Sequence, residues 1–107
     1  MSPTEQLPIA ELIAQDFDAD LDEICRVCGL DSDELRRWIE EGVAEPRAAA
    51  APSWQFSARQ LRRVWVARRL RRDLEVDTRS LPLVLDLLEE VEALRRRVRL
   101  LERVIED

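Results

Sequence analysis

The residues whose types and spacing could carry chemistry are Cys25 and Cys28, which form a C-x-x-C motif. Such a motif serves as a redox dithiol or as half of a metal site. The redox use needs a βαβ context that the sequence lacks, and zinc needs two further soft or imidazole ligands, whereas the chain has 2 Cys and no His. We therefore expect both cysteines to pack in the core, with no metal and no cofactor. Redox sensitivity and a metal site are the alternatives.

The charged side chains are the second set that could act chemically. The chain of 107 residues carries 23 acidic and 17 basic residues, and every basic residue is Arg. Without His, it lacks the side chain used most often as a general acid or base. These observations predict a binding protein rather than an enzyme.

The charges are distributed unevenly along the chain. Residues 1–54 hold 13 acids and 4 Arg, a net charge of -9, whereas residues 55–107 hold 10 acids and 13 Arg, a net charge of +3. The acidic half favours a basic protein partner over DNA. The sequence has no apolar run near the roughly 18 residues that cross a bilayer and no leader pattern at its start. We expect a cytoplasmic protein without membrane contact.

Two short helices must position the cysteines and the acidic side chains. The first is predicted from Asp20, because apolar residues recur at steps of three and four until Gly29 supplies a stop. The second has Asp31 or Ser32 as its N-cap and ends at Gly42. Two such helices joined by a short turn form a helix-turn-helix. The preceding residues 1–19 are expected to be an acidic N-terminal extension, either a frayed or docked tail or a short ordered segment.

A small wing and a third helix are predicted next. Residues 43–56 lack helical periodicity and read as an irregular hairpin or wing. Ser57 and Gln60 match a capping box that opens a helix ending near Leu74. We expect the arginines of this helix to pair mainly with acids of the N-terminal half. The expected core between the third helix and the helix-turn-helix contains Trp38, Trp54, Phe56, Leu61, Val64 and Trp65.

A last helix is predicted from an N-cap at Thr78, through Pro82 in its first turn, to the C-terminus. Its apolar residues follow a strict heptad with β-branched side chains at a and Leu at d, which favours a two-stranded coiled coil and hence a homodimer. The alternative is packing on its own domain, which Leu81, Leu85 and Leu88 favour for its first half. The expected dimer interface consists of Val84, Leu87, Val91, Leu94, Val98, Leu101 and Ile105.

The orientation of this dimer stays open at the level of the sequence. In a parallel pair Glu90 would face Arg95 of the partner helix, and Arg97 would face Glu102. In an antiparallel pair Glu90 would face Arg97, which is attractive too. The expected domain boundaries are residues 1–19 for the extension, 20–76 for the helix-turn-helix domain with wing and third helix, and 77–107 for the coiled-coil helix.

The second helix is the predicted partner-binding element. It carries five carboxylates on or beside it against two arginines, and carboxylates oppose the phosphate neutralisation that supplies most affinity for DNA. Direct nucleic-acid binding is therefore improbable, whereas a basic helix of a protein partner would fit this face. The alternative is that the acids form only a solvated surface. The candidate contact residues are Asp31, Asp33, Glu34, Arg37, Trp38, Glu40 and Glu41.

The segment from Leu21 to Pro46 resembles the start of a MerR-like helix-turn-helix, and residues 20–100 resemble more closely the chaperone-modulator family CbpM. The matching pieces are Glu23, Cys25 and Gly29, then Glu34-Leu35, Gly42-Val43, Glu45-Pro46-Arg47, Trp54 with Phe56, Arg69-Leu70-Arg71, Leu74 and Asp77. The resemblance implies an all-α, MerR-like winged helix-turn-helix with a small wing, followed by a C-terminal dimerising helix.

The same resemblance implies a chaperone modulator that binds the J-domain of a DnaJ/CbpA-like co-chaperone. Inhibition would follow from competition with the DnaK-type chaperone. The alternative is a MerR-like transcription regulator that binds DNA, and a purely structural dimerisation module is a third possibility.

Overall fold

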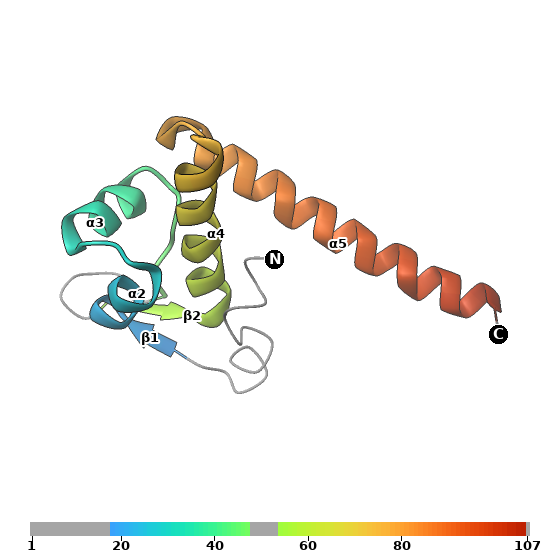
Figure 1. Ribbon diagram of the computed structural model, residues 1–107. Coiled ribbons are helices and arrows are strands. Elements are labelled where there is room, and N and C mark those ends of the chain that lie inside the picture. Colours follow the sequence, from blue (N-terminus) through green and yellow to red (C-terminus); the bar gives the residue numbers. More distant parts are fainter. Residues whose placement is uncertain (1–17, 48–53, 107) are drawn as a thin grey trace.

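The computed structural model describes residues 18–47 and 54–106, and its elements follow the predicted order (Figure 1). Within these described residues, four α-helices and a two-stranded sheet confirm the expected helical fold with a small wing. In chain order the elements are β1 (Asp18–Asp20), α2 (Leu21–Cys28), α3 (Ser32–Glu40), β2 (Gln55–Ser57), α4 (Ala58–Leu74), the 3-10 turn η2 (Thr78–Ser80) and α5 (Leu81–Glu106).

Side-chain caps define both helices of the helix-turn-helix. Asp20 accepts a hydrogen bond from the Glu23 backbone N–H at 2.8 Å, and the Glu23 carboxylate accepts one from the Asp20 N–H, which completes a capping box for α2. The helix ends at Gly29, whose φ of 70° is left-handed as the predicted stop requires. At α3 the carboxylate of Asp31 accepts from the Glu34 N–H at 2.8 Å. Asp31, and not Ser32, is therefore the N-cap.

Only one of the two hydrogen bonds of the predicted capping box is present at the start of α4. Ser57 accepts from the Gln60 backbone N–H at 3.2 Å, as expected. The Gln60 side chain does not return the bond, however, because its Oε1 accepts from the Glu45 N–H at 2.9 Å. The predicted reciprocal capping box is thus wrong, and Gln60 instead ties the wing to the start of α4.

The strand partner of β2 was not predicted. β2 pairs antiparallel with β1, with Ala19 opposite Phe56, rather than with another strand of a hairpin inside residues 43–56. Ala19 and Phe56 are both buried, so the sheet covers one side of the core. β1 spans the boundary expected between residues 19 and 20. The expectations for residues 1–17 and for the alanine run lie outside the described residues.

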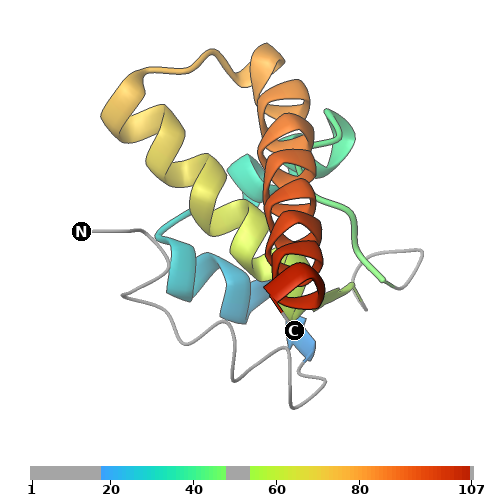
Figure 2. The same ribbon diagram turned by 90° about the vertical axis from the view of Figure 1, so that its right-hand side faces the viewer.

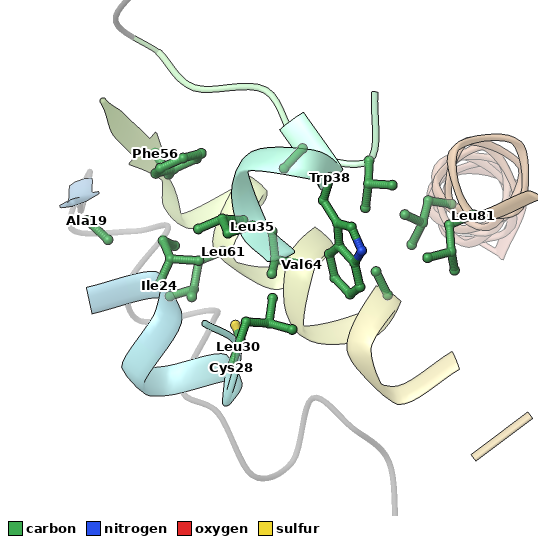
Figure 3. Packing of buried hydrophobic residues seen from close by; sticks show 14 residues of the cluster. Ala19, Ile24, Cys28, Leu30, Leu35, Trp38, Phe56, Leu61, Val64 and Leu81 are labelled. Atoms are coloured by element: carbon green, nitrogen blue, oxygen red, sulfur yellow. The ribbon is translucent and has the colours of Figure 1, made fainter. Parts of the chain in front are cut away.

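One hydrophobic core joins the sheet, the helix-turn-helix, α4 and the start of α5 (Figure 3). The predicted core residues Trp38, Phe56, Leu61 and Val64 are buried, and Trp54 and Trp65 pack against them while partly exposed. Other buried members are Ala19, Ile24, Cys28, Leu30, Leu35, Val43, Ala44, Ala67, Leu81 and Leu85.

α5 leaves the core after its first turns. Its entry is fixed by Asp77, which caps η2, so the predicted N-cap at Thr78 is wrong. Leu81 and Leu85 are buried as expected, whereas Leu88 is 39% exposed and does not pack on the domain as predicted. Beyond Glu92, α5 runs away from the other elements, and the turned view looks back along it (Figures 1 and 2).

Ion pairs hold the first half of α5 against α4. Arg62 makes a bidentate pair with Glu92, with N–O distances of 2.6 and 2.9 Å. Arg63 contacts Asp86 and Glu89 at 2.9 and 3.1 Å. The expectation that the arginines of α4 pair mainly with the acidic N-terminal half is therefore wrong for these two. Within the described residues, no helix is long and apolar enough to cross a membrane.

Candidate partner-binding site

The exposed face of α3 carries the predicted acidic residues. Asp33, Glu40 and Glu41 are exposed, and Glu34 is half-buried. In the part of the chain that the structure describes, none of these four carboxylates has a side-chain hydrogen bond or an ion pair. Asp31 differs, because its carboxylate is used as the N-cap of α3. Four of the five predicted carboxylates are thus available to a partner.

A hollow lies between α3, the last turns of α4 and η2. Four predicted contact residues line it, and Arg71 and Thr78 complete the wall. The structure therefore brings Glu34, Arg37, Trp38 and Glu41 together, whereas Asp33 and Glu40 lie on the neighbouring exposed part of α3 and do not line the hollow.

A second hollow adjoins the first and shares Glu34, Trp38 and Arg71 with it. Arg68 and Arg72 of α4 line this part, beside Gly29 at the end of α2. Sequence reasoning missed these arginines as site residues. The three-residue and four-residue steps from Arg68 to Arg71 and Arg72 were the available signal, because they place all three on one face of a helix.

Trp38 was predicted both as a core residue and as a partner contact, and the structure places it in the core. The residue is 5% exposed and belongs to the core, and Figure 3 shows its indole directed from α3 toward α4. It cannot project as an interface anchor. Its accessible remainder lines both hollows, so Trp38 forms an apolar floor between charged walls.

The two cysteines are free thiols, and their surroundings oppose thiolate chemistry. Burial raises the pKa of Cys28 to about 12, and Cys28 is 4% exposed, as the core prediction requires. Burial also raises the pKa of Cys25, with a contribution from Asp22 and Asp31, and Cys25 packs against the core while partly exposed. Within the described ranges, no group of three or more His, Cys, Asp or Glu is placed to hold a metal ion.

The predicted dimer seam is exposed in the single chain. Leu87, Val91, Leu94 and Val98 are 42–56% exposed, and exposure rises to 83% at Ile105. A shallow apolar hollow on α5 is lined by Val91, Leu94 and Val98, with Arg95 and Arg99 at its rim. The described residues leave this stripe uncovered, while Val84 is half-buried.

Comparison with known proteins identifies the family. Residues 19–103 match the family described as MerR HTH family regulatory protein. A chaperone modulatory protein CbpM from Coxiella burnetii (strain Dugway 5J108-111) is 30% identical over 100 residues, which cover 94% of each chain. A protein of the same name from Salmonella paratyphi B (strain ATCC BAA-1250 / SPB7) is 38% identical over 79 residues, 74% of this chain and 78% of the relative. The chain belongs to the CbpM family.

Membership in the CbpM family confirms the resemblance inferred from the sequence. The match to the MerR family covers α3, both hollows and the predicted dimer seam as far as Leu101. The relatives are named as chaperone modulators, and the matching family is described as regulatory, so neither comparison points to an enzyme class.

Proposed function

We propose that the chain binds the J-domain of a DnaJ/CbpA-like co-chaperone and lowers co-chaperone activity by competing with the DnaK-type chaperone. Its CbpM relatives, which are named chaperone modulatory proteins, support the modulator role. The proposed partner makes the cytoplasm the expected compartment.

One observation carries the proposal for the binding face: the unpaired acidic surface of α3. Asp33, Glu40 and Glu41 are exposed without side-chain partners in residues 18–47 and 54–106, and Glu34 stands at the edge of the hollow. A basic helix of a J-domain would complement this surface, and complementary charges accelerate association and fix orientation.

The proposed active form is a homodimer through α5. The exposed heptad stripe supports this assembly, because Leu94 and Val98 lie at the centre of an apolar surface that a second copy would cover. We retain residues 77–107 as the dimerising unit. We place the first boundary before β1, at residue 18, because Ala19 belongs to the core.

The experiment is titration calorimetry of the full chain against the J-domain of the CbpA-like co-chaperone from the same genome. We expect tight binding by the wild type, with weaker binding when Glu34 and Glu41 are both replaced by Lys. The effect should shrink at high salt because screening weakens charge attraction. Equal affinity of the folded Glu34→Lys/Glu41→Lys variant at low salt would exclude this face.

The alternative function is a MerR-like transcription regulator. The name of the matching family favours it, whereas the carboxylates of α3 oppose contact with phosphates. A gel-shift with genomic DNA fragments at physiological ionic strength separates the two functions. We expect no complex, and a nanomolar operator complex with a steep salt dependence would favour the regulator instead.

A further inference from the structure

We propose that the hollow between α3 and α4 binds an Asp or Glu side chain of the J-domain through Arg37 and Arg71. This inference rests on the proposed function and adds a carboxylate-binding subsite to a surface so far described by its acidic residues. Arg37 enters from α3 and Arg71 from the last turn of α4, and both line the same hollow.

Among the arginines that line the two hollows, Arg37 and Arg71 have no partner within the described residues. Arg68 donates to the Gly29 carbonyl at 3.4 Å, and Arg72 pairs with Asp73 at 3.1 Å. Arg37 and Arg71 form no side-chain hydrogen bond or ion pair anywhere in residues 18–47 and 54–106, although both are exposed.

A carboxylate is the group that this arrangement fits. Two guanidinium groups line this one hollow, so an anion bound between them would be attracted to both. Arg binds carboxylates with two parallel hydrogen bonds, which gives such a site geometric selectivity. Thr78 adds a hydroxyl donor, and Trp38 supplies an apolar floor for the methylene groups of an Asp or Glu side chain.

The acids of the same hollow define what must flank that carboxylate. Glu34 and Glu41 line the hollow without ion pairs in the described residues, so the site has both signs of charge. A partner segment with Lys or Arg on either side of one Asp or Glu would match all four charged groups. A uniformly basic helix would leave Arg37 and Arg71 facing like charges, which costs affinity and rejects such partners.

The test measures the affinity of the full-length chain for the same J-domain. Arg37→Gln and Arg71→Gln are made singly and together, and matched controls are Arg36→Gln on α3 and Arg59→Gln on α4. Both control residues are exposed arginines outside the two hollows. Circular dichroism melts establish that each variant is folded.

We expect Arg37→Gln and Arg71→Gln each to raise Kd by roughly ten- to 150-fold, the range for losing one charge-assisted hydrogen bond. The controls should stay within twofold of the wild type. Replacing each Asp and Glu of the J-domain by its amide should reveal one position whose loss is not additive with Arg71→Gln, which identifies the bound carboxylate.

Three outcomes would overturn the inference. If the double variant binds as well as the controls while Glu34→Lys/Glu41→Lys binds weakly, the proposed function stands and the subsite is wrong. If the wild type does not bind the J-domain, the function and the subsite both fail. If Arg37→Gln and Arg71→Gln weaken binding to a DNA duplex but not to the J-domain, the hollow is a phosphate site.

Discussion

Trp38 belongs both to the hydrophobic core and to the wall of the hollow between α3 and α4. Its indole is buried in the core, and its accessible remainder forms the floor of the hollow between α3 and α4. Truncating a buried Trp to Ala typically costs about 3–5 kcal/mol of stability. Loss of binding in such a variant would therefore report unfolding as much as lost contact. Charged residues on the rim, such as Arg71 and Glu41, are the better probes.

Cys28 gives a prediction that separates a packed thiol from a reactive one. Burial raises its pKa to about 12, so the folded state favours the neutral thiol. That contribution to the free energy of unfolding is fully present below about pH 9 and is lost as pH rises toward about 12. We expect iodoacetamide at pH 8 to label Cys28 far more slowly in the folded chain than in guanidinium. Equal rates in both states would contradict a buried Cys28.

Individual side chains were predictable where their role is local. The cap at Ser57, and the choice of Asp31 or Ser32 for α3, follow from residue type and the three-residue spacing to a backbone N–H. The hydrogen bond of the Gln60 side chain could not be predicted. Its partner is the backbone N–H of Glu45, which only the folded wing brings to the start of α4.

At the scale of elements, Arg63 connects three of them. Its side chain is 9% exposed, and it donates to the Val43 carbonyl at 2.6 Å and the Gly42 carbonyl at 3.3 Å. The same guanidinium pairs with Asp86 and Glu89 of α5. The turn after α3, α4 and the first half of α5 are thus held together by one side chain, which sets the direction in which α5 leaves the domain.

Arg63→Met tests this connection. Removing the guanidinium leaves the carbonyl of Val43, a fully buried residue, without this donor, which costs about 1–3 kcal/mol. The matched control is Arg62→Met, which removes a partly exposed pair with Glu92 and should cost about 0–1 kcal/mol. Urea unfolding measures both, and equal losses would contradict a special role for Arg63.

The helices could be predicted from apolar periodicity, but their mutual contacts could not. β1 and β2 have three residues each, too few for a period-two pattern, and their pairing joins segments more than 30 positions apart. The arginines of α4 likewise have many acids within reach in the sequence. Burial of Leu81 and Leu85 fixes how α5 packs on the domain. This packing, and not the sequence, places three acids of α5 beside Arg62 and Arg63, namely Asp86, Glu89 and Glu92.

At the scale of the whole molecule, the exposed stripe of α5 predicts self-association. Leu94 lies at its centre and is 47% exposed in the single chain. Leu94→Asp would bury a carboxylate in the seam of a dimer, so we expect the variant to sediment as a monomer at micromolar concentration while the wild type is a dimer. A monomeric wild type, or a dimeric variant, would place the interface elsewhere.

The distribution of charge along α5 favours an antiparallel dimer. Residues 81–92 carry four acids and no Arg, whereas residues 93–106 carry five Arg and two acids. A parallel pair would set the arginine-rich halves side by side, and an antiparallel pair separates them. The antiparallel register that joins Glu90 to Arg97 also brings Leu83 opposite Val104, two apolar side chains that are 64% and 72% exposed.

Charge exchange at two positions distinguishes the orientations. Glu90→Arg should weaken the dimer in either case, because position 90 faces Arg97 in the antiparallel pair and Arg95 in the parallel one. Each exposed pair contributes about 0.2–1 kcal/mol, so the two symmetric pairs change Kd by roughly two- to thirtyfold at low salt. We expect a second change, Arg97→Glu, to restore wild-type association in sedimentation equilibrium, and Arg95→Glu to leave it weak. The opposite pattern of rescue would establish a parallel dimer.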